Sequence, residues 1–195
     1  MRYVAFDIET LGLEAQTCDV IEIGAILDNT ESLAPIDQLP RWHCYVAKGL
    51  YTGQPYAMAM NWRILKRIAD REEGYNYFKP ENITYSFLSW LSSLQVNIDD
   101  GVVFFGKNVG AFDMGFMDQR IPEWNKIKRS HRYGDFGMYF WDLTKDHRRL
   151  PSLDDCLERA GIAKRTNHTA LDDAELVVLL TRHVIEKKMY SARPI

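Results

Sequence analysis

The stretch that decides the fold is YVAFDIET, residues 3–10, near the start of the chain. Its alternating pattern predicts a strand, because successive side chains of a strand point to opposite faces. Apolar residues then share one face, whereas Asp7 and Glu9 share the other. Two carboxylates about 7 Å apart or less, in a partly desolvated place, repel each other and raise each other's pKa. A divalent cation between them removes that cost, so the stretch predicts a metal site built on a strand; a solvent-facing edge strand is the simpler alternative.

The composition describes an ordinary globular chain. Its 195 residues suit one domain, which we expect to span residues 1–195, with 46% hydrophobic and 26% charged residues. The net charge of -3 excludes a broad basic surface, so any nucleic acid would bind at a local site. Bound divalent metals would reverse the local charge, so mild acidity is compatible with a phosphate substrate.

The cysteines and the hydrophobic segments indicate a compartment. Cys18, Cys44 and Cys156 form no C-x-x-C pair and are interpreted as free thiols in a reducing compartment, which predicts a cytoplasmic protein. The chain begins directly with a strand pattern, without a signal peptide. No apolar run approaches the roughly 20 residues that span a bilayer, so no membrane partner is expected.

The periodicity along the chain predicts alternating strands and helices. We expect strands at 3–10, 19–27, 42–46, 102–105 and 138–141. We expect helices at 61–68, after Pro80, at 108–122, at 152–161 and at 170–188. This order predicts an α/β fold with a mixed sheet flanked by helices, its first strand near the centre and its second strand antiparallel to the first.

A further acid follows the fourth predicted strand. Asp113 ends the segment NVGAFD, residues 108–113, which we place at the start of a helix. Ligand sites in open α/β sheets lie beyond the ends of such strands, so Asp113 could complete a metal site. The alternative is a carboxylate that only stabilises the helix N-terminus.

The segment HTALDDA, residues 168–174, carries a second group of polar residues. Thr169 and Asp172 have capping-box spacing, which leaves His168 in the preceding loop and Asp173 among apolar helix positions. A histidine beside carboxylates can act as a general base, because its pKa lies near working pH. The remaining histidines are interpreted as surface residues: His43, His131, His147 and His183.

Together these motifs resemble the DEDDh family of 3′–5′ exonucleases. The residues that match are Asp7, Glu9, Asp113, His168 and Asp173, within FDIET, NVGAFD and HTALDDA. Each motif alone is weakly specific, but the three occur in the family's order. The resemblance implies a ribonuclease-H-like fold with a five-stranded sheet of order 3-2-1-4-5.

The resemblance also implies an activity and a cofactor. The four acids would hold two Mg²⁺ or Mn²⁺ ions, and His168 would take a proton from the attacking water. The substrate would be a 3′ end of single-stranded DNA or RNA, released as 5′-nucleoside monophosphates. By resemblance, the terminal nucleotide would meet Thr10, Leu11, Leu13, Asn108 and Phe112. Core packing is the alternative for the two leucines and Phe112.

Several alternatives stay open from the sequence. The nuclease could be restricted to very short oligonucleotides, as oligoribonuclease is, or the chain could bind nucleic acid without catalysis. Residues 58–62 could contact substrate or only pack as a helix, and the basic residues between Lys126 and Arg132 could guide a phosphate backbone or only be solvated. Relatives include dimers, so a homodimer is allowed, although no interface signature is visible.

Overall fold

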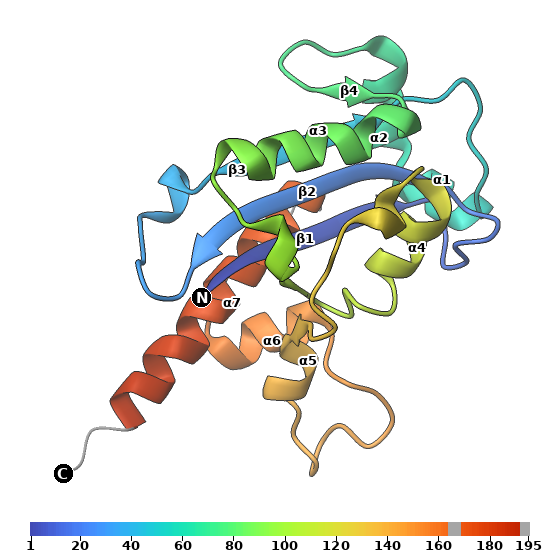
Figure 1. Ribbon diagram of the computed structural model, residues 1–195. Coiled ribbons are helices and arrows are strands. Elements are labelled where there is room, and N and C mark those ends of the chain that lie inside the picture. Colours follow the sequence, from blue (N-terminus) through green and yellow to red (C-terminus); the bar gives the residue numbers. More distant parts are fainter. Residues whose placement is uncertain (164–168, 192–195) are drawn as a thin grey trace.

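The protein, in a computed structural model, forms one sheet with helices on both faces (Figure 1). The structure describes residues 1–163 and 169–191, with side chains up to residue 187. The strands are β1 (Arg2–Thr10), β2 (Val20–Asn29), β3 (Arg41–Val46), β4 (Tyr77–Phe78), β5 (Phe104–Gly106) and β6 (Gly134–Asp135). The helices are α1 (Pro55–Met60), α2 (Trp62–Asp70), α3 (Pro80–Ser93), α4 (Asp113–Arg120), α5 (Phe136–Tyr139), α6 (Leu153–Ala160) and α7 (Ala170–Ser191).

The sheet has the order β4-β3-β2-β1-β5-β6. Strand β2 runs antiparallel to both β1 and β3, whereas β5 is parallel to β1 and β6 is parallel to β5. The predicted order 3-2-1-4-5 is therefore confirmed, with the two-residue strand β4 added at one edge. Strand β1 lies inside the sheet, as its apolar face requires.

The two faces of β1 belong to two different cores. Val4, Phe6 and Ile8 pack with α3 and α4 on one face. Tyr3 and Ala5 pack with α6 and α7 on the other. Because side chains alternate along a strand, Asp7 and Glu9 continue the second face. The sequence pattern therefore directs both acids toward the side of the sheet that α7 covers (Figure 1).

A glycine lets α7 approach the sheet at the level of the acids. Gly24 lies directly opposite Asp7 in the β1–β2 register. A Cβ atom at Gly24 would lie 2.3 Å from the backbone carbon of Ala170, the first residue of α7. Any side chain there would push the start of α7 away, so Gly24 sets the close contact between helix and sheet.

Ion pairs fix the rest of α7 against the strands. Arg182 binds the buried carboxylate of Asp28 with two nitrogen atoms, at 3.0 and 2.9 Å, and the Tyr3 hydroxyl donates to the same carboxylate at 2.8 Å. Arg41 of β3 also lies 2.6 Å from Glu175. The hydrogen bonds hold the pKa of Asp28 below its usual value despite burial. These contacts anchor α7 to β2 and β3, and the Tyr3 hydrogen bond links β1 to the same carboxylate.

The structure corrects two predicted elements. Residues 138–141 do not form a strand: the fifth strand is β6, and residues 136–139 form α5, because Asp135 caps this helix by accepting from Gly137 N at 2.7 Å. The helix predicted from residue 108 begins only at Asp113, since Asn108 has a left-handed φ of 59° and starts a turn. No described helix combines the length and the apolar character that crossing a membrane requires.

Candidate active site

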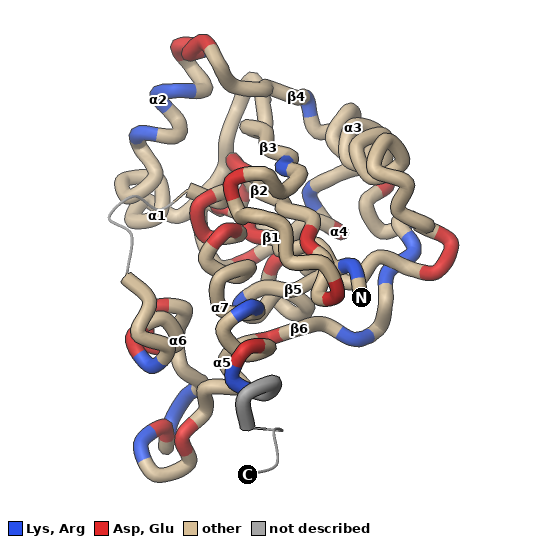
Figure 2. The backbone as a smooth tube through the Cα atoms, turned by 90° about the vertical axis from the view of Figure 1, so that its left-hand side faces the viewer, with Lys and Arg blue, Asp and Glu red and all other residues tan. Residues whose placement is uncertain are grey.

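Three acids from opposite ends of the chain meet on the α7 face of the sheet. Asp7, Glu9 and Asp173 each offer a carboxylate oxygen, and these oxygens lie within 4.8 Å of one another. Figure 2 shows acidic segments on β1 and β2, near the centre of the fold. Two of the acids come from neighbouring positions of β1, and the third comes from the first turn of α7. Such a cluster needs a positive charge to be ionised as a whole.

A local irregularity follows Glu9. The β1–β2 register shifts between Glu9 and Thr10, so that Glu9 faces Glu22 but Thr10 faces Val20. Irregularities of this kind bend a strand and redirect the chain beyond it. The Asn61 amide then donates to the Thr10 carbonyl at 3.0 Å, which ties the α1–α2 junction to the end of β1. The two acids of β1 therefore stand where the sheet opens toward α1 and α2.

Asp113 is the first residue of α4 and is 3% exposed. It does not belong to the group of three carboxylates within 4.8 Å, but its charge is the largest electrostatic influence on Asp7. Burial and the charge of Asp135 raise the pKa of Asp113 to about 8, although hydrogen bonds from the backbone of Asp113 and Ile8 oppose the shift. Asp113 thus extends the acidic cluster across β1.

The pKa values of the β1 acids show how unfavourable the cluster is without a cation. Burial, followed by the charges of Asp113, Asp173, Glu9 and Glu22, raises the pKa of Asp7 well above its usual value. Burial and the charge of Glu22 also raise the pKa of Glu9 to about 8. At neutral pH these groups would hold protons, and a bound cation would displace them.

This donor set fits hard divalent cations. Mg²⁺ and Mn²⁺ prefer carboxylate oxygen and water, and the cluster supplies only oxygen ligands. It contains no thiol or imidazole within the described residues, so a zinc-type ligand set is not present there. The residues that could hold metal are Asp7, Glu9 and Asp173, with Asp113 beside Asp7.

The start of α7 has the predicted cap. The Asp172 N–H donates to Thr169 Oγ1 at 3.2 Å, and the Thr169 hydroxyl donates to the Asp172 carboxylate at 2.8 Å. Asp172 thus serves the cap, while Asp173 faces the other acids. The predicted general base, His168, lies outside the described residues.

Sequence reasoning missed another acid beside the cluster. Glu22 is 0% exposed and lies opposite Glu9, and its Oε1 lies 2.6 Å from His43 Nε2. Its other oxygen has no hydrogen-bond partner among the described residues. The sequence suggested that His43 is a surface residue, but His43 is instead the partner of a buried carboxylate. The available signal was a single glutamate within the apolar strand segment VIEIGAIL, residues 20–27.

A groove of about 1040 Å³ opens beside the acids. Glu9, Thr10, Glu22 and His43 form part of its wall, and residues 54, 56, 57 and 60–64 supply the opposite side. Trp62 is 54% exposed there. Because this groove combines exposed apolar side chains with acids at one end, it can accept an extended polar chain with flat rings.

The five predicted substrate residues do not share one location. Thr10 and Leu13 line the groove, and Leu13 is 77% exposed. Leu11 is completely buried and packs with α2, so its predicted substrate contact is wrong and core packing is its role. Asn108 is exposed and donates its backbone N–H to Asp135, while Phe112 is partly buried against Phe116.

The basic segment between Lys126 and Arg132 is largely engaged in local contacts. Lys126 lies 2.7 Å from Glu123, and Arg129 lies 2.9 Å from Asp118. Lys128 donates to the Asp99 carbonyl. These contacts favour the interpretation that this segment is structural and solvated.

The chain was compared with models of protein families and with curated protein sequences. A model of the exonuclease family RNase_T matches residues 4–181. No curated protein sequence matches the chain significantly.

Solved structures share the fold at low sequence identity. The nuclease domain of 3′hExo, a DEDDh family member bound to rAMP, has a TM-score of 0.66 at 14% identity; the match covers 95% of this chain and 92% of that one. E. coli Exonuclease I in complex with a dT13 oligonucleotide has a TM-score of 0.63 at 15% identity, with coverages of 97% and 42%. S. pombe Pop2p in its Mg²⁺ and Mn²⁺ bound form has a TM-score of 0.61 at 13% identity, with coverages of 99% and 86%. The chain thus spans about two fifths of Exonuclease I.

Proposed function

The chain belongs to the RNase_T exonuclease family, and from this premise we propose that it is a 3′–5′ exonuclease of the DEDDh type. Its substrate is a single-stranded 3′ end of DNA or RNA, and its products are 5′-nucleoside monophosphates. The observation that carries the proposal is the cluster of Asp7, Glu9 and Asp173 together with the large groove that Glu9 lines. The resemblance read from the sequence supports the same activity.

The acids hold the cofactor in this proposal. Asp7, Glu9, Asp113 and Asp173 would bind two Mg²⁺ or Mn²⁺ ions, a choice that the all-oxygen donor set supports. The chemistry supplied by such a pair is activation of water and stabilisation of charge on the leaving oxygen. The Pop2p structure, which holds both kinds of ion, supports this assignment by analogy.

The reaction is hydrolysis of the last phosphodiester. The water oxygen bonds to phosphorus, the bond to the 3′ oxygen of the preceding nucleotide breaks, and His168 takes the proton of the water. The leaving 3′ oxygen receives a proton from solvent. In the sequence, His168 directly precedes Thr169, which caps the helix that carries Asp173.

The groove binds the strand that leads to the scissile bond. Leu13, Tyr56, Met60 and Trp62 line it with exposed apolar surface, on which bases of any sequence can stack. Arg63 supplies a positive charge for phosphates. The exposure of Met60 and Trp62 favours substrate contact over helix packing for this part of residues 58–62. The oligonucleotide bound to Exonuclease I supports a single-stranded substrate.

The proposal covers residues 1–195 as one exonuclease domain. The cytoplasmic location stays a prediction, supported by three cysteines that are all free and buried. The homodimer also stays a prediction, which sedimentation of the purified protein would check.

The test uses 20-nucleotide DNA and RNA strands labelled at the 5′ end, single-stranded and in duplex, with Mg²⁺ or Mn²⁺. We expect a ladder that shortens from the 3′ end, and EDTA should stop it. Asp7→Asn should abolish the ladder, and Asp37→Asn, at an exposed position, should leave it unchanged. Wild-type protein that binds strands but releases no nucleotide under any of these conditions would favour the non-catalytic alternative. Cleavage of dinucleotides but not of 20-mers would favour the short-oligonucleotide alternative.

A further inference from the structure

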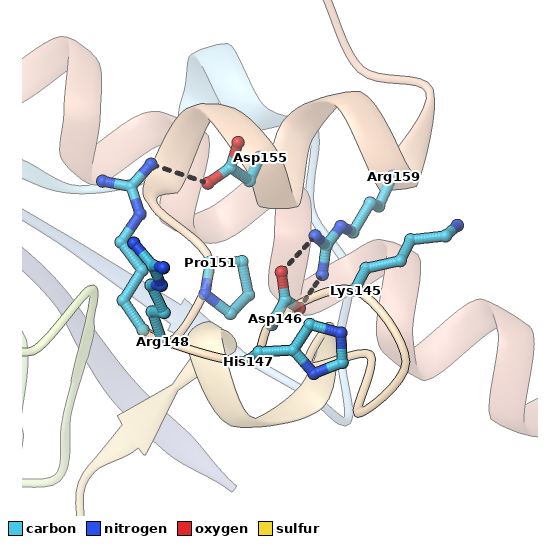
Figure 3. A pocket seen from close by; sticks show the side chains of 8 residues that line it. Lys145, Asp146, His147, Arg148, Pro151, Asp155 and Arg159 are labelled. Atoms are coloured by element: carbon cyan, nitrogen blue, oxygen red, sulfur yellow. Dashed lines mark hydrogen bonds and ion pairs between the residues drawn. The ribbon is translucent and has the colours of Figure 1, made fainter.

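A second pocket lies on the loop that joins α5 to α6, residues 140–152. It has a volume of about 390 Å³ and shares no lining residue with the groove beside the acids. Figure 3 shows the side chains that line it, which come from the α5–α6 loop and from α6. They are Lys145, Asp146, His147, Arg148, Arg149, Pro151, Asp155 and Arg159.

The acids of this pocket are already bound within the protein. Arg159 binds Asp146 with two nitrogen atoms, at 2.5 and 2.7 Å (Figure 3). It also donates to the Phe140 carbonyl. Asp155 accepts from the backbone and the hydroxyl of Ser152, both at 2.8 Å, as part of the α6 capping box. These contacts give the loop a fixed shape, and they use the carboxylates that could otherwise neutralise its cations.

The other basic side chains of the pocket have few hydrogen-bond or ion-pair partners within the described residues. No hydrogen bond or ion pair joins Arg148 or His147 to any other described residue. Arg149 lies 3.9 Å from Asp155 with its side chain 80% exposed, and Lys145 lies 3.4 Å from Asp142 with its side chain 76% exposed. The segment between Lys126 and Arg132 differs, because its cations make closer contacts with acids or a carbonyl. Positive charge is therefore available at the α5–α6 loop.

We propose that this pocket binds a phosphate group, through the guanidinium groups of Arg148 and Arg149 with Lys145 and His147 beside them. Guanidinium groups present paired N–H donors that match phosphate oxygens, and phosphate is strongly attracted to such an excess of cations. The assigned source is a backbone phosphate of a nucleic-acid strand, upstream of the 3′ end that occupies the acidic groove. The assignment of the phosphate to a nucleic-acid strand rests on the proposed exonuclease function. The proposal that the pocket binds phosphate does not depend on that function.

The test measures binding in EDTA, so that it is independent of cleavage. Fluorescence anisotropy would compare a labelled dT20 strand with a labelled dT2 dinucleotide, for the wild type and for the Arg148→Ala/Arg149→Ala variant. We expect dT20 binding to weaken about tenfold at 50 mM salt, with a salt slope smaller by about 1.4, since each of the two lost cation contacts lowers it by about 0.7. Binding of dT2 should not change, because a dinucleotide has only one internucleotide phosphate to place and the groove shares no lining residue with the pocket.

A matched control removes the same charge elsewhere. The Lys126→Ala/Lys128→Ala variant should bind dT20 within about twofold of the wild-type affinity. An equal loss of affinity in both variants would overturn the proposed phosphate pocket, because the loss of overall positive charge would then explain the weaker binding. Unchanged dT20 binding in the arginine variant would also overturn the strand assignment. If inorganic phosphate binds to the wild type but not to the arginine variant, and the affinity for dT20 is the same in both, the pocket binds free phosphate and not a strand.

These outcomes are distinguishable from failure of the proposed function. If the wild type releases no nucleotides but the arginine variant still loses dT20 binding, the exonuclease proposal fails and the phosphate pocket stands. If nucleotide release from dT2 is normal and dT20 binding is insensitive to both arginines, the pocket fails and the exonuclease proposal stands.

Discussion

The molecule gathers charge in two ways, in the acidic cluster on β1 and α7 and in the basic pocket of the α5–α6 loop. The acids are partly buried, come from distant parts of the chain and raise the pKa of the two β1 carboxyl groups. The cations of the loop are exposed, make only long ion pairs, and come from a few neighbouring residues. Buried like charges need a counter-ion, whereas exposed ones are screened by water and salt. The cluster is therefore expected to control chemistry and stability, and the pocket only affinity.

The sharpest test of this contrast removes one acid. Asp173→Asn keeps the size of the side chain but removes a ligand charge, so nucleotide release should fall by at least about a thousandfold. Strand binding in EDTA should be retained or improved, because one negative charge is lost. Single-turnover nucleotide release and anisotropy would measure both. A variant that loses binding and activity together would break the division of roles.

A second test moves the helix that supplies this acid. Gly24→Ala places a methyl group against the backbone of Ala170, so the free energy of unfolding should fall by about 1–3 kcal/mol. Urea denaturation would measure this change, and nucleotide release should fall as Asp173 moves away. Gly49→Ala is the matched control, because nothing lies within 4 Å of a Cβ there. Equal stability of the two variants would contradict the close contact.

A third test concerns the acid that sequence reasoning missed. Glu22→Gln removes a charge beside Glu9 without changing shape, and outer charges of this kind tune metal affinity by about tenfold or more. We expect Mn²⁺ to bind about tenfold more weakly at pH 9, where protons no longer compete. Electron paramagnetic resonance of free Mn²⁺ would follow the titration. Unchanged affinity would confine Glu22 to a structural role with His43.

The last test concerns the pH dependence of stability. Glu9 and Asp113 have pKa values of about 8 in the folded, metal-free protein, against about 4 when unfolded. The folded state therefore binds more protons between about pH 4 and 8, so the metal-free protein should lose stability as pH rises through this window. Mg²⁺ should restore stability mainly above pH 7. Thermal melts with EDTA or Mg²⁺ would check this, and stability that rises with pH in EDTA would contradict the pKa directions.

Much of this arrangement was predictable because its signals are local. The alternation of residues 3–10 gave β1 and the face of its two acids, and capping-box spacing placed the starts of α6 and α7. The sheet order followed from the order of strands and helices together with the family resemblance.

One error arose from a local cap, and the others arose where tertiary contacts overrode local preference. The aromatic run at residues 138–141 suggested a strand, but the Asp135 cap begins a helix just before it. Leu11 follows the acidic strand in sequence, yet packing against α2 buries it completely. The pairing of Glu22 with His43 joins neighbouring strands, and no spacing within either strand reveals such a partner.

The contact between Gly24 and the start of α7 also bears on how the protein matures during synthesis. Asp7 and Glu9 emerge from the ribosome well before Asp173, so the three acids cannot meet until α7 has been made and docks against Gly24. In the exonuclease proposed above, activity would therefore begin only after this helix has docked on the sheet.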